Sequence, residues 1–159
     1  MFSRIAIIFA LFFTISGCAN EPGSLNDIHT GTSAGHSKSY NAASGLLYNL
    51  NSSAIVAVRG NETKYAVSTR FLSTGMGWSF FREAWSFGQQ MEFNVTNETV
   101  ASCGSGTCSH IEDGAIVMTR AQFEKAAQTG FEFKLVGKNR SVIGKLPAEA
   151  FKEALAFFP

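Results

Sequence analysis

Segments in which apolar and polar residues alternate recur along most of the chain and predict β-strands. Residues 64–71 (KYAVSTRF) alternate in this way, and residues 54–59 (AIVAVR) form an apolar run rich in branched side chains. A Gly-Asn dipeptide lies between the two segments, which together predict a β-hairpin. The other predicted strands are 91–95 (MEFNV), 99–103, 107–111, 115–118, 131–135 (FEFKL) and 140–146.

Two segments of the C-terminal third have helical signals instead. Thr119 and Gln122 form a capping-box pattern, and Gly130 stands where a helix-ending glycine is expected. Pro147 suits the first position of a second helix, whose apolar residues recur at spacings of three and four. The pattern therefore predicts a β-rich fold, all-β to α+β. We expect a single antiparallel β-sandwich or barrel-like domain over residues 46–158, with two short helices in the C-terminal third.

The most aromatic segment is residues 78–87 (WSFFREAWSF). Under strict alternation, Trp78 and Ala84 would face one way and Phe81 and Trp85 the other. Aromatic rings on both faces suit a central strand or a bent strand that crosses between layers. The segment is also the best candidate for a ligand-binding surface, with Trp78, Phe81, Arg82 and Trp85 as its residues, although such rings more often belong to a core.

The N-terminus has the pattern of a secretory signal. Residues 1–17 carry one charge, Arg4, followed by an apolar stretch too short to span a bilayer comfortably. Ile15-Ser16-Gly17-Cys18 resembles the bacterial lipobox, in which an aliphatic residue and two small residues precede the cysteine that receives lipid. The resemblance implies a diacylglycerol thioether on Cys18, cleavage before it and acylation of the new amine. An ordinary signal peptide and an uncleaved anchor are the alternatives.

The resemblance also bears on location. Two or three acyl chains, palmitate among them, would anchor the protein stably in a membrane. Ala19 and Asn20 follow the cysteine where an aspartate would favour retention in the inner membrane, so the outer membrane is expected, at its periplasmic face or its surface. Residues 18–45 are rich in Ser, Gly, Asn, Thr and Ala, and predict a flexible tether with a reach of about 25–30 Å.

Composition and charge narrow the function classes. The chain has 159 residues, of which 45% are hydrophobic and 16% charged, so a packed core is expected and general disorder is excluded. Thirteen Lys and Arg against twelve Asp and Glu leave no basic face, so nucleic acid is not an expected partner. The expected partners are the membrane, through the lipid anchor, and a protein of the envelope.

With Cys18 assigned to lipid, Cys103 and Cys108 remain as a pair. The segment CGSGTC places them across a Gly-Ser-Gly turn between two predicted strands, so we expect a disulfide. A redox site and a zinc site are the alternatives. On a strand, Cys108, His110 and Glu112 would project to one side, but a disulfide removes the thiolate that zinc would need.

Catalytic patterns are weak. A hydrolase would need His110 with Asp113 and one of several serines, and Glu112-Asp113 is more simply interpreted as a polar turn before Gly114. We therefore predict no catalytic residue, no metal site and no cofactor.

The C-terminal third resembles the invasion-associated locus B family of periplasmic or secreted bacterial proteins. The resemblance covers residues 100–157 and rests on the Cys103 to Cys108 loop, the helix ending at Gly130, the FEFKLVG strand and the closing AFKEAL helix. It implies an envelope β-domain without known catalysis and identifies no functional residues.

The leading functional hypothesis is a non-enzymatic, lipid-anchored envelope protein whose β-domain binds another envelope component. The alternative is a periplasmic carrier of a small ligand, with an aromatic pocket around Trp78, Phe81 and Trp85.

Overall fold

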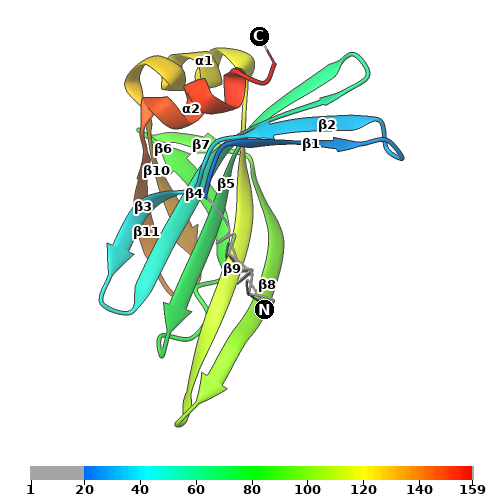
Figure 1. The fold of residues 1–159 in the computed structure, drawn as a ribbon. Helices are drawn as coiled ribbons and strands as arrows, with labels where there is room; N and C mark the ends of the chain where they lie inside the picture. The colour runs from blue at the N-terminus through cyan, green and yellow to red at the C-terminus, as the bar shows by residue number, and fades with distance from the viewer. Residues whose placement is uncertain (1–19, 159) are drawn as a thin grey trace, which may run out of the picture.

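Two antiparallel β-sheets packed face to face, with two helices at one end, make up the computed structural model, which describes residues 20–158 (Figure 1). The strands are β1 (Gly23–Asp27), β2 (Thr32–His36), β3 (Tyr40–Gly45), β4 (Tyr48–Arg59), β5 (Glu62–Thr74), β6 (Phe81–Ser86), β7 (Gln89–Met91), β8 (Phe93–Gly104), β9 (Thr107–Met118), β10 (Phe131–Gly137) and β11 (Ser141–Leu146). The helices are α1 (Arg120–Thr129) and α2 (Ala148–Leu155). The predicted sandwich with two C-terminal helices is confirmed, and the sheets are not closed into a barrel.

The seven-stranded large sheet has the order β1-β2-β4-β5-β9-β8, and β3 pairs with β4 beside β2. The predicted hairpin over residues 54–71 is the centre of this sheet, where β4 and β5 pair along their whole length. Side chains of β4, β5 and β9 alternate between buried and partly exposed, as period-two patterning requires. The buried set faces the second sheet.

The four-stranded small sheet has the order β11-β10-β6-β7, with the predicted β10–β11 hairpin at one edge. On its other side β10 pairs with β6, and the register skips Arg82, which is an extra residue in β6. Because of this bulge, Phe81 and Ala84 both face inward. The strict alternation expected for residues 78–87 is therefore wrong.

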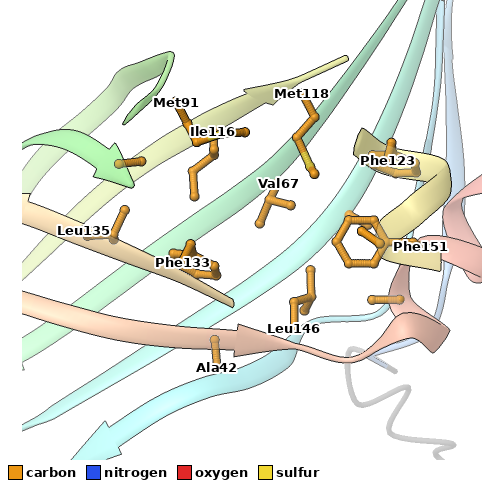
Figure 2. Close-up of a cluster of buried hydrophobic side chains, with 14 of the residues drawn as sticks. Ala42, Val67, Met91, Ile116, Met118, Phe123, Phe133, Leu135, Leu146 and Phe151 are labelled. Atoms are coloured by element: carbon orange, nitrogen blue, oxygen red, sulfur yellow. The ribbon is translucent and has the colours of Figure 1, made fainter. Parts of the chain in front are cut away.

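The core lies between the sheets and extends under the helices. Figure 2 shows Val67 and Ile116 of the large sheet facing Phe133 and Leu135 of the small sheet, with the helical residue Phe151 beside them. The largest fully buried side chains are Phe71, Phe123, Phe133, Phe151, Leu50, Ile116, Leu135 and Leu146. Among the described residues, no helix is long and apolar enough to cross a membrane.

Both helices begin near their predicted positions. The hydroxyl of Thr119 accepts from the backbone N–H of Gln122, whose side chain accepts from the backbone N–H of Thr119, so the capping box is confirmed. Gly130 ends α1 with a positive φ of 77°. Pro147 is the N-cap residue of α2, one position before its first helical residue.

The flexible tether predicted for residues 18–45 is wrong for residues 20–45, and residues 1–19 lie outside the described part of the chain. β2 and β3 both pair with β4, so they extend the large sheet. Composition alone missed this because a strand that pairs with an existing edge satisfies its backbone groups without many large apolar side chains. Small residues also permit close packing: a Cβ on Gly35 would lie 2.7 Å from the Cβ of Phe157.

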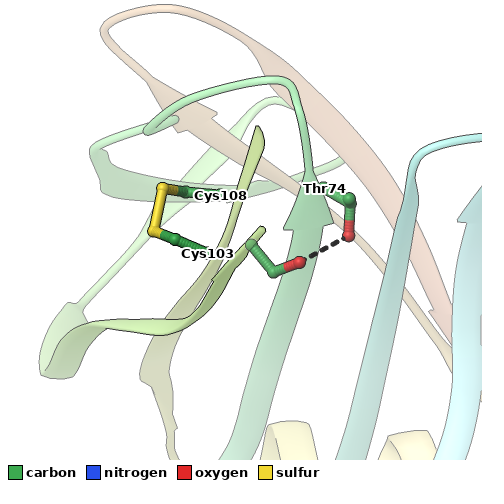
Figure 3. Close-up of a disulfide and its surroundings, with 4 residues drawn as sticks. Thr74, Cys103 and Cys108 are labelled. Carbon is green, nitrogen blue, oxygen red and sulfur yellow. Dashed lines mark hydrogen bonds between the residues drawn. A yellow bond between two sulfur atoms is a disulfide. The ribbon is translucent and has the colours of Figure 1, made fainter. Parts of the chain in front are cut away.

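The β8–β9 hairpin projects beyond the sandwich and carries the Cys103–Cys108 disulfide near its tip (Figures 1 and 3). The two Cα atoms are 4.1 Å apart and the residues are paired in the ladder. The predicted disulfide is confirmed. Below it, the hydroxyls of Thr74 and Ser109 are 2.8 Å apart and join the hairpin to β5.

We expect the double variant Cys103→Ser/Cys108→Ser to lose about 2 kcal/mol of unfolding free energy or less, because the disulfide closes a short loop. Urea denaturation of the oxidised and variant proteins would measure the difference. Hydrogen exchange should show faster exchange at the hairpin tip and unchanged rates in β4 and β5. Loss of protection in those central strands would contradict a local role for the disulfide.

Candidate functional site

The four residues predicted as a ligand-binding surface are not brought together. Phe81 is 3% exposed and packs edge-on against Phe71, with ring centroids 5.1 Å apart. Trp78 lies against His110, with ring centroids 4.5 Å apart. The indole N–H of Trp85 donates to the carboxylate of Glu83 at 2.8 Å. Within residues 20–158, no ring contact joins Trp78, Phe81 and Trp85. The aromatic pocket around these residues stays a prediction.

Arg82, the fourth of these residues, connects the two sheets. Its guanidinium donates to both carboxylate oxygens of Glu98 in β8, at 2.7 and 3.1 Å, and to the backbone carbonyl of Phe81. The hydrogen bond to Glu98 raises the pKa of Arg82 above its ordinary value. This side chain fastens the bulge of β6 to the edge of the large sheet.

Glu112 is not part of a polar turn, as the sequence suggested, but lies within β9 and is 5% exposed. Its carboxylate accepts backbone N–H groups from Ser79 at 2.6 Å, Phe80 at 2.7 Å and Phe81 at 3.4 Å. Phe80 has a positive φ of 55°, which is unfavourable for a bulky side chain. Glu112 therefore holds the turn by which the chain passes from the large sheet to the small one.

The groups considered for catalysis are separated by the alternation of β9. His110 and Asp113 are three positions apart on one strand, so they point to opposite faces. Asp113 is bound by the guanidinium of Arg70 at 2.9 and 3.0 Å. Nδ1 of His110 is buried and has no hydrogen-bond partner within residues 20–158. The hydrolase arrangement of His110 and Asp113 is therefore not assembled.

The residues considered for zinc share a face as predicted, since Cys108, His110 and Glu112 are spaced two positions apart along β9. Cys108 is committed to the disulfide, and Glu112 to backbone N–H groups. In the described part of the chain, no group of three or more metal-binding side chains is placed to hold a metal ion.

One concave surface is a pair of adjoining open hollows at the helical end of the small sheet, of about 540 and 240 Å³. We call it the helix-end groove. Both hollows are lined by Phe87, Thr129, Gly130, Phe131 and Glu132. The wider hollow is completed by Lys145, Leu146, Pro147 and Ala148, and the narrower by Ser86, Gln89, Met91, Met118, Gln122, Lys125 and Ala126.

Phe87 is the most unusual residue of the groove. It forms the two-residue turn between β6 and β7 with Gly88, and both residues have positive φ, 45° and 85°. Such turns favour Asn-Gly, and a bulky side chain at positive φ is disfavoured by about 1–2 kcal/mol. The ring of Phe87 is nevertheless 87% exposed. Neither the backbone nor the core benefits from phenylalanine at this position.

The groove floor is apolar and its rim is polar. Phe131 stacks on Phe133 with centroids 5.6 Å apart and so is fixed by the core beneath it. On the rim, Lys145 and Glu132 form an ion pair at 2.8 Å. A shallow surface of this kind can accept an apolar side chain of a larger partner, whereas a small ligand is normally enclosed.

Few features of the sequence indicate this groove. Phe87 belongs to the aromatic segment 78–87, but the opposite wall of the groove comes from the end of α1 and the start of β10. A phenylalanine immediately before a glycine in a predicted turn is the one signal that could have indicated it.

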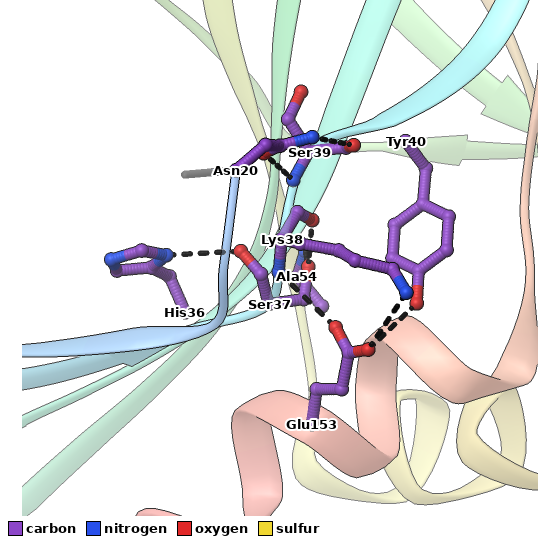
Figure 4. A network of polar contacts seen from close by, with 8 residues as sticks. All are labelled: Asn20, His36, Ser37, Lys38, Ser39, Tyr40, Ala54 and Glu153. Atoms are coloured by element: carbon purple, nitrogen blue, oxygen red, sulfur yellow. Dashed lines mark hydrogen bonds and ion pairs between the residues drawn. The ribbon is translucent and has the colours of Figure 1, made fainter. Parts of the chain in front are cut away.

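A polar cluster also joins the N-terminal strands to α2 (Figure 4). The Tyr40 hydroxyl donates to Glu153 at 2.9 Å, and Lys38 lies 3.6 Å from the same carboxylate. Partial burial, followed by the hydrogen bond to Glu153, raises the pKa of Tyr40 above its ordinary value. These contacts position α2, and we assign the cluster a structural role.

The structure defines the class of fold: an antiparallel β-sandwich with two helices at one end. No family model, curated protein or solved structure matches the chain. The resemblance of residues 100–157 to the invasion-associated locus B family stays a prediction.

Proposed function

We propose that this protein is a non-enzymatic, lipid-anchored bacterial envelope protein whose β-domain binds another envelope protein through the helix-end groove. The membrane anchor is the lipid on Cys18, and the outer membrane is the favoured location. The observation that carries the binding role is Phe87, an exposed ring on an unfavourable backbone. Residues held in a strained conformation that does not stabilise the fold are typical of functional sites.

The chemistry of the groove indicates the kind of partner. An exposed ring beside the partly buried Phe131 provides an apolar anchor of the type that dominates protein interfaces. The rim pair of Lys145 and Glu132 is close to neutral, so binding does not depend on a strongly charged partner. A protein that presents an apolar side chain on a convex surface fits these features.

We expect Phe87→Asn to weaken partner binding by roughly 30-fold, which corresponds to about 2 kcal/mol for an aromatic anchor. Asn suits a positive φ, so the variant should be at least as stable as the wild type. In-cell crosslinking followed by mass spectrometry would compare partner recovery. The matched control is Leu46→Asn, at the β3–β4 turn, where the side chain is 99% exposed and far from the helices (Figure 1).

Two results would count against the proposal. Equal partner recovery from Phe87→Asn and Leu46→Asn would remove the groove as the binding surface. The absence of any reproducible partner of the wild type would overturn the binding role. The same membrane preparation also tests the anchor, because an unmodified Cys18 or a retained signal peptide in the intact mass would exclude lipidation.

The alternative function is a periplasmic carrier of a small ligand, for which the narrower hollow, lined in part by Met91 and Met118, is the relevant space. A thermal-shift screen with lipids, sugars and peptidoglycan fragments would distinguish it. A stabilising compound whose effect disappears in Gln122→Trp, which fills that hollow, would favour the carrier.

A further inference from the structure

The first described residue is fastened to the domain. The Asn20 side chain donates to the backbone carbonyl of Ser39 at 2.7 Å and accepts the backbone N–H of Ser39 at 2.7 Å (Figure 4). Ser39 lies in the link between β2 and β3, both of which are paired with β4. The chain therefore reaches the large sheet at residue 20, with paired hydrogen bonds that fix its position.

The distance from this point to the lipid anchor is short. One residue, Ala19, separates Asn20 from Cys18. Consecutive Cα atoms are about 3.8 Å apart, so the Cα atoms of Cys18 and Asn20 can be separated by at most about 7.6 Å. A lipid on Cys18 would hold the edge of the large sheet near the membrane surface, where a tether of 25–30 Å was expected.

The surface beside this attachment point is the outer face of the large sheet. Ser39 and the outward-facing side chains of four strands line a hollow of about 270 Å³. They are Asn51 and Ser53 of β4, Ser68 and Arg70 of β5, Thr96 of β8 and Asp113 of β9. We call this surface the hydroxyl-amide face, after the short side chains that make up most of it.

The charges on this face neutralise each other. Arg70 and Asp113 are joined by two hydrogen bonds, and the bond to Asp113 raises the pKa of Arg70. Glu62 and Lys64 of β5 lie on the same face as Ser68 and Arg70 and form a second ion pair, at 3.3 Å. The outer face of the small sheet carries Glu83, Glu132, Lys134 and Lys145. Placing charged side chains against a bilayer costs free energy because they lose hydrating water. Hydroxyl and amide groups, in contrast, can donate hydrogen bonds to the phosphate and carbonyl oxygens of the lipids.

We infer that the domain lies directly on the bilayer surface, with the hydroxyl-amide face toward the lipid headgroups. The inference rests on the proposed lipid anchor at Cys18. It deepens the proposed function because the helix-end groove, which is formed by the small sheet and the helices, then faces away from the membrane. In this position Phe87 is presented to a partner in the aqueous space.

Quenching of a fluorophore by headgroup-labelled lipid tests the orientation. The full-length lipidated protein would carry a single added cysteine, Thr96→Cys on the hydroxyl-amide face or Ile143→Cys on the small sheet, labelled with a thiol-reactive dye. Both positions are exposed, and Thr96 is an extra residue at a bulge of β8, so labelling should spare the ladder. Phosphatidylethanolamine–phosphatidylglycerol vesicles with a nitroxide headgroup lipid provide the quencher.

We expect several-fold stronger quenching at position 96 than at position 143. Insertion of a long Gly-Ser segment between Ala19 and Asn20 should abolish the difference while the protein remains on the vesicles. Equal quenching at the two positions, or stronger quenching at 143, in protein that floats with the vesicles would overturn the orientation alone. Failure of the wild type to float would overturn the lipid anchor and the orientation together.

Discussion

Glu112→Ala is expected to lower the unfolding free energy by about 4 kcal/mol, because the variant leaves buried backbone N–H groups without an acceptor. The carboxylate accepts from Ser79, Phe80 and Phe81, at the turn between the two sheets. Alanine supplies no acceptor, and the buried position is poorly placed for water to replace one. Urea denaturation followed by circular dichroism would measure the loss.

The matched control is Glu98→Ala on the neighbouring strand, opposite Glu112 in the ladder. Glu98 pairs with the exposed Arg82, so its removal should cost about 1 kcal/mol or less. Glu112→Gln keeps one acceptor oxygen and should fall between the two alanine variants. If Glu112→Ala were as stable as Glu98→Ala, the role of this carboxylate in holding the turn would be wrong.

Phe151→Ala is the second substitution with a large expected effect, also about 4 kcal/mol. Phe151 is fully buried, and its ring packs edge-on against Phe123 of α1 and Phe131 of β10, with centroids 4.9 and 6.3 Å away. Removing it would leave a cavity at the point where α2 meets α1 and the small sheet. Thermal unfolding followed by near-ultraviolet circular dichroism would measure the change in stability and packing.

Phe157→Ala provides the comparison for this position, because Phe157 is 36% exposed and belongs to the segment after α2. It should lose clearly less stability than Phe151→Ala. Phe157 does pack against Gly35, so a measurable loss is expected and would itself support the docking of β2 onto the C-terminal segment. Equal losses in the two variants would contradict the central position of Phe151.

The β4–β5 and β10–β11 hairpins and the capped helix α1 were predictable because their signals are local. Alternation in residues 64–71 and the pairing of Thr119 with Gln122 depend only on near neighbours along the chain. The disulfide was predictable for the same reason, since Cys103 and Cys108 are close in sequence.

The errors occurred where a distant partner decides the structure. Residues 20–45 have the composition of a linker, yet the free edge of β4 supplies partners for β2 and β3. In residues 78–87, the bulge at Arg82 determines which side chains face inward, and the bulge itself depends on how β6 pairs with β10. Neither the edge pairing of β2 and β3 nor the bulge at Arg82 produces a periodic pattern in the local sequence from which it could be predicted.

The candidate site shows the same division. Phe87 and Phe131 line one groove because the β6–β7 turn lies beside the end of α1, an arrangement that only the packing of the small sheet produces. Glu112 is buried and binds backbone N–H groups because the turn before β6 crosses over β9.

By itself the sequence determined the class of fold and the disulfide, since each rests on spacing within a short stretch. The lipobox-like segment stays a prediction. The tertiary structure decided that residues 20–45 belong to the folded domain, which aromatic side chains reach the surface and which acid is buried. These properties depend on contacts between segments far apart in the chain, whose energies no local pattern records.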